Sequence, residues 1–118
     1  MKFDNVLTLT TIDIKELTGG IQTYANMPLA IINDHVVRVS IMTAAYFWHL
    51  HPNSDETFLV MEGTVFIDLD TKTVELLPGQ LFTIPKGIPH RTRPGGARSV
   101  NLTFEGQDME TVILEGRD

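Results

Sequence analysis

The side chains best suited to chemistry are three histidines and one glutamate, namely His49, His51, Glu56 and His90. Imidazole nitrogens combined with a carboxylate oxygen suit Mn, Fe, Co, Ni, Cu or Zn, whereas Ca and Mg prefer sites built from oxygen atoms. Four such ligands leave two positions of an octahedron open for water or a small molecule. The sequence therefore predicts a divalent transition-metal site, with Mn, Fe, Ni or Zn as candidate ions and no organic cofactor.

A strand and a turn are expected to position the first three of these residues. Residues 44–51 are apolar and aromatic, which favours a strand. On a strand His49 and His51 point to the same face, with Cα atoms about 6.7 Å apart. The turn cluster at 52–55 then leads to Glu56, which opens a second strand expected to run back beside the first.

A second turn is expected to deliver His90. Residues 85–89 contain two prolines, which fix φ, and Gly87, which is free to adopt positive φ. His90 then begins another strand. An H-x-H pair alone is weak evidence for a metal, since an isolated histidine is more often a satisfied polar residue, but here the residues fall into two ordered motifs.

These motifs are H-x-H-x4-E-x6-G, from His49 to Gly63, and G-x5-P-x-G-x2-H, from Gly79 to His90. They resemble the two motifs of the cupin superfamily. The chain departs from the family pattern at Thr43, where the first motif usually has glycine, and at Pro94, where the second usually ends with asparagine. Neither departure touches a ligand position.

The resemblance implies that the metal ligands are His49, His51, Glu56 and His90. It also implies an all-β fold, the double-stranded β-helix (jelly-roll) cupin barrel. Residues 1–118 would form a single cupin domain with its metal-binding core at about 37–104. The many short β-prone segments separated by turn residues agree with a sandwich or barrel. Within the superfamily, the chain looks most like small cupins described as similar to mannose-6-phosphate isomerase.

The β-prone stretch 36–48 predicts which side chains surround the metal. If it runs without a bulge into His49, one face carries the residues that share the histidines' side, Val37, Val39, Ile41, Thr43, Ala45 and Phe47. The opposite face carries Arg38, Ser40, Met42, Ala44, Tyr46 and Trp48. That opposite face is too apolar to be left in water, and packing within the chain and a contact with a second subunit explain it equally well.

Candidate pocket residues follow from the same reasoning and from the charge distribution. They are Thr43, Phe47, Phe58, Arg91 and Arg93. The two arginines belong to a basic cluster that also contains Lys86 and Arg98, and this cluster could steer an anionic substrate. The alternative is a solvated loop edge paired with acidic residues, which is the commoner role of such clusters.

The composition narrows the classes of partner. A net charge of −6 argues against nucleic-acid binding. There is no cysteine, no basic segment followed by an apolar leader and no long apolar run, so we expect a cytoplasmic protein that does not enter a membrane. Residues 12–17, stopped by Gly19 and Gly20, predict either one helical turn or a strand. The family resemblance implies that such an N-terminal segment pairs with a partner subunit, so a homodimer is expected.

Two classes of function remain open from the sequence. The first is a metal-dependent enzyme acting on a small polar metabolite, by resemblance a sugar or sugar-phosphate isomerase or epimerase, or a dioxygenase. The second is a module that binds or senses a small ligand without converting it. The sequence offers no clear general base, because His35 lies in a predicted turn and Tyr46 falls on the face away from the histidines. The lack of a base favours the second class, and the catalytic residues are unknown. The intact ligand set favours the first.

Overall fold

The computed structural model describes residues 6–117, and it is nearly all β-structure. The expectations for the first five residues and for Asp118 lie outside this range. The elements, in chain order, are α1 (Ile14–Thr18), β1 (Ala25–Ile32), β2 (His35–Met42), β3 (His49–Leu50), β4 (Glu56–Glu62), β5 (Val65–Leu69), β6 (Thr73–Leu76), β7 (Leu81–Ile84), β8 (His90–Pro94), β9 (Ser99–Gly106) and β10 (Val112–Ile113). Among the described residues no helix has the length and apolar character needed to cross a membrane.

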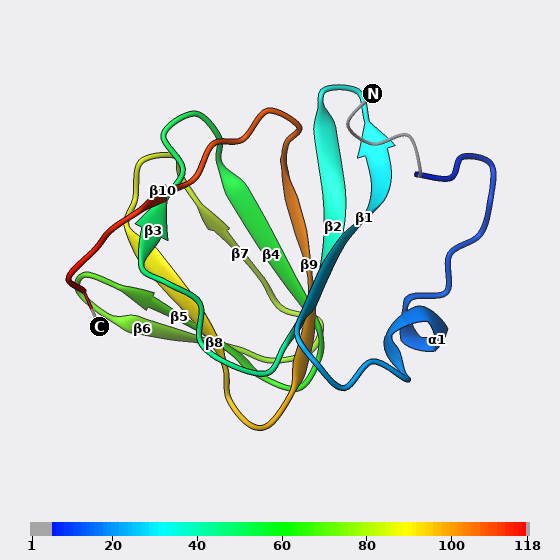
Figure 1. The fold of residues 1–118 in the computed structure, drawn as a ribbon, viewed down its shortest axis with the longest axis horizontal. Helices are drawn as coiled ribbons and strands as arrows, with labels where there is room; N and C mark the ends of the chain where they lie inside the picture. Colours follow the sequence, from blue (N-terminus) through cyan, green and yellow to red (C-terminus); the bar gives the residue numbers. More distant parts are fainter. Residues whose placement is uncertain (1–5, 118) are drawn as a thin grey trace.

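The strands form two five-stranded sheets that enclose a barrel interior (Figure 1). One sheet has the order β1-β2-β9-β4-β7 and the other has the order β10-β3-β8-β5-β6. Neighbouring strands are antiparallel throughout both sheets. From β6 to β10 successive strands alternate between the two sheets, and the architecture is the expected jelly roll.

The prediction of one strand running from residue 36 into His51 was wrong. Strand β2 ends at Met42, residues 43–48 are irregular, and β3 belongs to the opposite sheet. The expected hairpin is also absent, because β3 pairs with β8 and β10 whereas β4 pairs with β7 and β9. The physical reason is that 43–48 carries the chain from one sheet to the other, which a continuous strand could not do.

The predicted faces of β2 are therefore exchanged. Val37, Val39 and Ile41 lie on the outer face, in an aliphatic cluster that also contains Leu29, Val100 and Leu102. Ile12 and Ile14, from α1 and the segment before it, pack on this cluster, and Figure 1 places α1 on the outside of the sheet. Residues at the intervening positions of β2 face the interior instead. The parity counted back from His49 failed because the crossing segment interrupts the alternation.

Packing within the chain accounts for the apolar residues that had been assigned to the other face. Met42 and Tyr46 line the internal cavity. Trp48 is buried on the outside of the second sheet, where the guanidinium of Arg117 lies 3.9 Å from its ring centroid and that of Arg91 lies 5.7 Å away. These contacts remove the need for a second subunit to cover Trp48.

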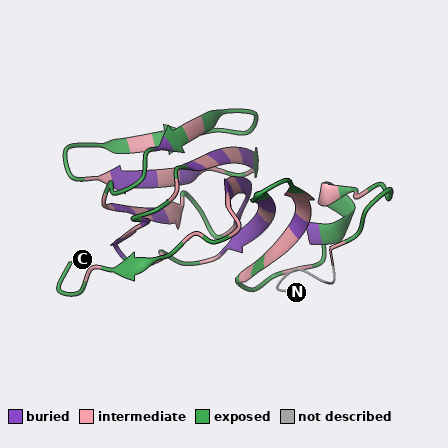
Figure 2. Cartoon of the chain, turned by 90° about the horizontal axis from the view of Figure 1, so that it is seen from above, coloured by how far each residue is buried: buried purple, intermediate pink, exposed green. Residues whose placement is uncertain are grey.

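A second buried cluster fills one end of the barrel interior. Its members come from both sheets, so they join the two layers: Phe58, Val60, Val65, Ile67, Leu76 and Ile84. Figure 2 shows that the buried residues lie mainly in the strands of the two sheets, whereas many of the connecting loops are exposed. The apolar packing occupies this end only, and the other end of the interior is lined by polar side chains.

Candidate metal centre

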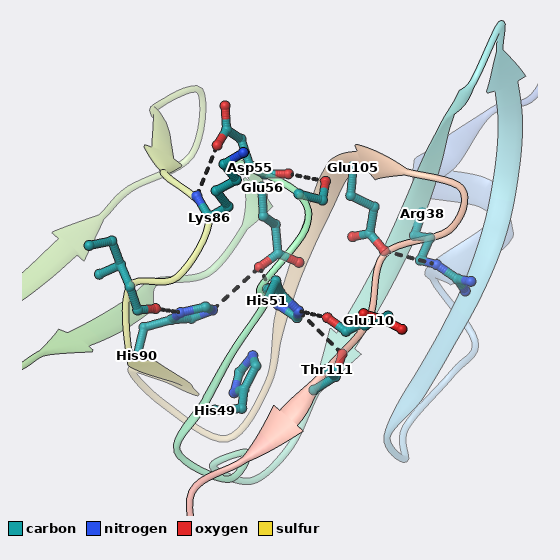
Figure 3. A network of polar contacts seen from close by, with 12 residues as sticks. Arg38, His49, His51, Asp55, Glu56, Lys86, His90, Glu105, Glu110 and Thr111 are labelled. Carbon is teal, nitrogen blue, oxygen red and sulfur yellow. Dashed lines mark hydrogen bonds and ion pairs between the residues drawn. The ribbon is translucent and has the colours of Figure 1, made fainter.

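The structure brings together the four residues in which the sequence predicted a metal site. One ligand atom from each of His49, His51, Glu56 and His90 lies within 4.8 Å of every other, and all four side chains are buried. Strands β3 and β8 place His49 directly opposite His90, and Glu56 comes from the start of β4 in the facing sheet. Figure 3 shows the four side chains converging from these separate elements.

Two turns hold the ligand-bearing segments together. The backbone N–H of Gly87 donates to the carbonyl oxygen of His51 at 2.8 Å, and the N–H of Lys86 donates to Asp55 Oδ1 at 2.9 Å. Gly87 has a φ of +82°, in the left-handed region that the sequence had suggested. The turn before His90 is thus bonded directly to the turn before Glu56.

Each histidine is oriented by a backbone carbonyl on the side away from the centre. The Nδ1 atoms of His49, His51 and His90 lie 2.7, 3.0 and 2.9 Å from the carbonyl oxygens of Phe47, Glu110 and Ile88 respectively. A carbonyl oxygen can only accept, so each Nδ1 carries the proton and each Nε2 presents its lone pair. This fixed tautomer is the one that a metal-binding imidazole requires.

Three atoms that face the centre have no hydrogen-bond partner within residues 6–117. This is true of His51 Nε2, His90 Nε2 and Glu56 Oε1, although each is buried. Glu56 Oε1 lies 3.2 Å from His51 Nε2 and 3.4 Å from His90 Nε2, without the geometry of a hydrogen bond. Since buried polar atoms are rarely left unsatisfied, three orphaned lone-pair donors at one point fit a divalent metal ion.

Burial and mutual charge set the protonation of the cluster. Burial, reinforced by the neighbouring His90, lowers the pKa of His49 to about 4, so this imidazole is neutral at pH 7. Burial raises the pKa of Glu56, but the two adjacent imidazoles outweigh it and the net shift is downward, which keeps the carboxylate ionised. Burial lowers the pKa of His51, but Glu56 outweighs it and the net shift is upward. A neutral imidazole beside an ionised carboxylate suits metal coordination.

An internal cavity of about 340 Å³ opens beside the cluster. Its lining is mainly polar and comes largely from β1, β2, β9 and β4 of one sheet, with further residues from β3, β8, the crossing segment 43–48 and the C-terminal segment. The lining residues are Tyr24, Asn26, Arg38, Ser40, Met42, Tyr46, His49, His51, Glu56, Phe58, Thr92, Asn101, Thr103, Glu105, Met109 and Thr111. A small polar molecule could therefore reach the centre from this side.

Glu105 is a functional candidate that the sequence analysis missed. It lies on β9 directly opposite Glu56 on β4, buried in the cavity wall, with Oε2 3.4 Å from Arg38 Nε (Figure 3). Burial, together with the charge of Glu56, raises the pKa of Glu105 to about 7. The alternation of β9 could have identified it, because Asn101, Thr103 and Glu105 are polar residues at every second position of a strand within the core.

Tyr46 was excluded by the incorrect parity and lies in the cavity. Its ring contacts the imidazole of His49 edge-on, with centroids 5.0 Å apart. Burial, and then the nearby charges of Tyr24 and Glu56, raise the pKa of Tyr46, so the phenol stays protonated and can donate a hydrogen bond to a bound molecule. The sequence carried no signal for this placement, which depends on the turn made by 43–48.

Among the five candidate pocket residues, the structure places only Phe58 in the cavity lining. Thr43 and Phe47 belong to the crossing segment, and Phe47 is 65% exposed. Arg91 and Arg93 point to the outer face of the second sheet and pair with the buried Asp68.

Two further members of the basic cluster also lie away from the cavity. Arg98 donates to the carbonyl oxygens of Thr18 and Ile21, which holds the end of α1 against the barrel, and it pairs with Glu62. Lys86 lies in the turn before His90. Three of the four members, Arg91, Arg93 and Arg98, therefore pair with acidic residues, as the alternative interpretation expected, and none of the four lines the cavity.

Comparisons with known proteins agree with this geometry. The chain is 42% identical to the uncharacterized protein YdbB of Bacillus subtilis over 115 residues, which cover 97% of this chain and 95% of that protein. A crystal structure of a cupin-2 domain containing protein from Shewanella frigidimarina superposes with a TM-score of 0.72 at 26% identity, covering 79% of this chain and 90% of that one. Germin-like protein subfamily 1 member 5 of Arabidopsis thaliana is 26% identical over 118 aligned positions, covering 92% of this chain and 49% of the plant protein.

These comparisons give no support to the narrower likeness to mannose-6-phosphate isomerase-like cupins. They do agree on the family. A model of the cupin domain matches residues 37–104, which include all four clustered ligand residues and the strands that carry them. With more than half of its length matched and with the jelly-roll barrel in place, the chain belongs to the cupin family.

Proposed function

We propose that this protein is a metal-dependent enzyme that moves a proton on a small polar metabolite, in an isomerase or epimerase type of reaction. The observation that carries the proposal is the position of Glu105. A second buried carboxylate lines the cavity beside the four candidate metal ligands, where an acid or base for a bound substrate is needed. Residues 1–118 would act as one cupin domain in this role.

The chemistry follows from the donor set and its neighbours. His49, His51, Glu56 and His90 would hold the ion, which supplies Lewis-acid polarisation of a substrate carbonyl or hydroxyl oxygen when bound. Glu105 is placed to accept a proton from the carbon beside that carbonyl and to return it to a neighbouring atom. The protonated phenol of Tyr46 would donate a hydrogen bond to a substrate oxygen. Arg38 holds the Glu105 carboxylate in the cavity wall.

Deuterium exchange tests the proposal directly. Metal-loaded protein would be incubated in D2O with a panel of hydroxyaldehydes, hydroxyketones and sugar phosphates, and the products followed by NMR. We expect deuterium to appear at carbon next to the carbonyl of at least one compound. Glu105→Gln should reduce that rate by about a hundredfold or more, because removal of a general base typically costs that much. His35→Gln replaces an exposed histidine outside the cavity and serves as the control, which should leave the exchange rate unchanged.

Two other outcomes would replace the proposal. Oxygen uptake by the iron-loaded protein, without exchange, would favour the dioxygenase alternative. A ligand-induced rise in melting temperature without exchange or turnover would mean that the chain is a binding or sensing module. The homodimer, the cytoplasmic location and the absence of nucleic-acid or membrane partners stay predictions, and size-exclusion chromatography with light scattering tests the first of them.

A further inference from the structure

A stripe of buried polar side chains runs along the cavity wall away from the metal centre. Strand β9 lies in the middle of its sheet, where apolar residues are the rule, yet Asn101, Thr103 and Glu105 all face the cavity. Their exposed fractions are 1%, 5% and 6%. Burying polar groups is unfavourable unless they are hydrogen-bonded, so the stripe calls for partners.

The side-chain oxygen of Asn101 lacks such a partner among the described residues. Its Nδ2 donates weakly to the carbonyl oxygen of Leu102 at 3.3 Å, but its Oδ1 has no hydrogen-bond partner although the side chain is almost fully buried. An unsatisfied buried acceptor is destabilising, and it becomes favourable when a donor reaches it. Because Asn101 lines the cavity, a molecule bound there can supply that donor.

The strand register sets how far such a molecule must extend. Glu56 lies opposite Glu105, and Val60 lies opposite Asn101, four residues further along both strands. Four residues of β-strand span about 13 Å, so Asn101 lies at the end of the cavity remote from the metal centre and would contact the part of a ligand bound there. A ligand that contacts both ends is therefore elongated.

The charges near the stripe indicate neutral rather than anionic groups at the remote end. Arg38 is the only lysine or arginine among the described residues of the cavity lining, and its Nε lies 3.4 Å from Glu105 Oε2 while its Nη1 donates to Asn26 at 3.3 Å. Its guanidinium is therefore already engaged away from Asn101, and the lining offers no other cation to an anionic group bound beside Asn101. Hydroxyl groups, by contrast, can donate to the Asn101 oxygen and accept from neighbouring donors.

We infer that Asn101 and Thr103, the part of the stripe that extends away from Glu105 and the metal centre, form a second recognition site, which binds the distal hydroxyl groups of an extended polyhydroxy carbonyl or carboxylate compound. The oxygen atoms at the other end of that compound lie at the metal centre, so the inference rests on the proposed metal site. Asn101 is its specificity-determining residue, because its Oδ1 accepts a hydrogen bond from a distal hydroxyl group.

Two probe molecules of equal carbon number separate the two ends of the cavity. Gluconate and 2-hydroxyhexanoate both carry a 2-hydroxycarboxylate group for the metal, but only gluconate has hydroxyl groups along the rest of its chain. Isothermal titration of the metal-loaded protein should show gluconate binding about tenfold or more tightly, as expected when a buried acceptor gains a donor. Metal content would be measured in the same samples.

Three variants then locate the preference. Asn101→Leu removes the acceptor at similar volume and should abolish the preference while leaving affinity for 2-hydroxyhexanoate within about threefold, which is the size of a small packing change. Asn101→Asp retains an acceptor and should retain a preference. Ser99→Ala is the matched control, because Ser99 lies on the same strand with an unpartnered buried Oγ but outside the cavity lining, and it should change neither affinity.

Equal affinities of the two probes for the metal-loaded wild-type protein would overturn the inference, as would an unchanged preference in Asn101→Leu. No binding of gluconate by metal-loaded protein would overturn it as well. Failure of the metal site itself would be recognised separately, because the protein would then hold no ion in the elemental analysis of the same samples. Circular dichroism of each variant confirms that the fold is retained.

Discussion

The two faces of β2 and β9 are both buried, but by different means. On the outer face, Val39 and Ile41 are fully covered by other apolar side chains and by the segment around α1. On the inner face, Ser40 and Asn101 are also buried, but in the wall of a polar cavity. The outer face is packed against apolar side chains, whereas the cavity side of the inner face carries an acceptor, Asn101 Oδ1, that has no hydrogen-bond partner among the described residues.

This difference separates stability from function within one pair of strands. The aliphatic face stabilises the barrel because it removes apolar area from water. The polar face contributes little apolar burial, and it carries the groups to which the proposals above assign recognition or conversion of a ligand. Substitutions on the outer face should therefore lower the unfolding free energy, whereas substitutions on the inner face should mainly change ligand binding.

The largest effect on stability is expected for Ile41→Ala on the outer face. Ile41 has no exposed surface, and truncating a buried isoleucine leaves a cavity that costs about 4 kcal/mol of unfolding free energy. Urea unfolding would measure this, and the variant should still bind metal at the wild-type stoichiometry while folded. A loss below about 1 kcal/mol would mean that the outer face is not a packed core.

Acid should destabilise the metal-free protein through His49. The folded-state pKa of His49 is about 4, below its ordinary value of 6.5, so the unfolded chain takes up this proton first. Neutral His49 therefore makes its full contribution to the unfolding free energy above about pH 6.5. This contribution, roughly 3 kcal/mol at most, is lost as the pH falls toward about 4.

Urea unfolding of chelator-treated protein across that pH window measures the loss. His49→Gln cannot titrate and should show a flatter dependence, whereas His35→Gln, at an exposed position, should behave as wild type. An identical pH dependence in wild type and His49→Gln would contradict the role of His49.

A third region sharpens the comparison, because it buries a charge whose partners are all present. Asp68 accepts hydrogen bonds from Arg91, Arg93 and Thr73 at 2.7 to 3.1 Å on the outside of the second sheet. The hydrogen bonds from Arg93, which more than offset burial, hold the pKa of Asp68 well below its usual range. Its contribution is therefore present near neutral pH and is lost only in strong acid.

Asp68→Asn should lower the unfolding free energy at pH 7 by about 2 kcal/mol, the scale of hydrogen bonds to a charged group. Asp70→Asn is the matched control, since Asp70 pairs with Arg117 at the surface and should cost less than about 1 kcal/mol. Equal effects of the two substitutions in urea titrations would show that burial of the Asp68 pair has no special weight.

The smallest effect is expected on the inner face. Ser40→Ala removes a hydroxyl group that lines the cavity next to Asn101, and we expect a change of less than about 1 kcal/mol in unfolding free energy. Thermal melting of Ser40→Ala beside Ile41→Ala compares adjacent residues of one strand. Similar losses in both variants would remove the distinction between the two faces.

The fold class and the ligand residues were predictable because two short motifs carry the resemblance to the cupin superfamily. Those motifs include Gly87 and the spacing of His49, His51, Glu56 and His90, whereas the local strand and hairpin expected to position the ligands were wrong. The wall of the cavity was not predictable, because it depends on where the chain changes sheets. No residue between 43 and 48 indicates that the chain crosses between sheets there. The inner and outer faces of β2 were therefore predicted the wrong way round, and Tyr46 was not considered a cavity residue.

Glu105 is a second residue whose place in the site could not be predicted from the sequence. Its alternation with Thr103 and Asn101 could be read from the sequence, but its place opposite Glu56 follows from the pairing of β9 with β4. These strands are far apart along the chain, and nothing in either segment specifies the partner. The sequence therefore predicted the candidate metal ligands but not the residues that would act on a substrate.

Elemental analysis of protein purified without added metal or chelating resin tests the central claim most directly. The account predicts about one equivalent of a transition metal in the wild-type protein and in His35→Ala, and loss of that metal in the His49→Ala, His90→Ala double variant, because four protein ligands are reduced to two. A double variant that retains one equivalent would contradict the assignment, as would a folded wild-type protein that takes up none of Mn, Fe, Co, Ni, Cu or Zn.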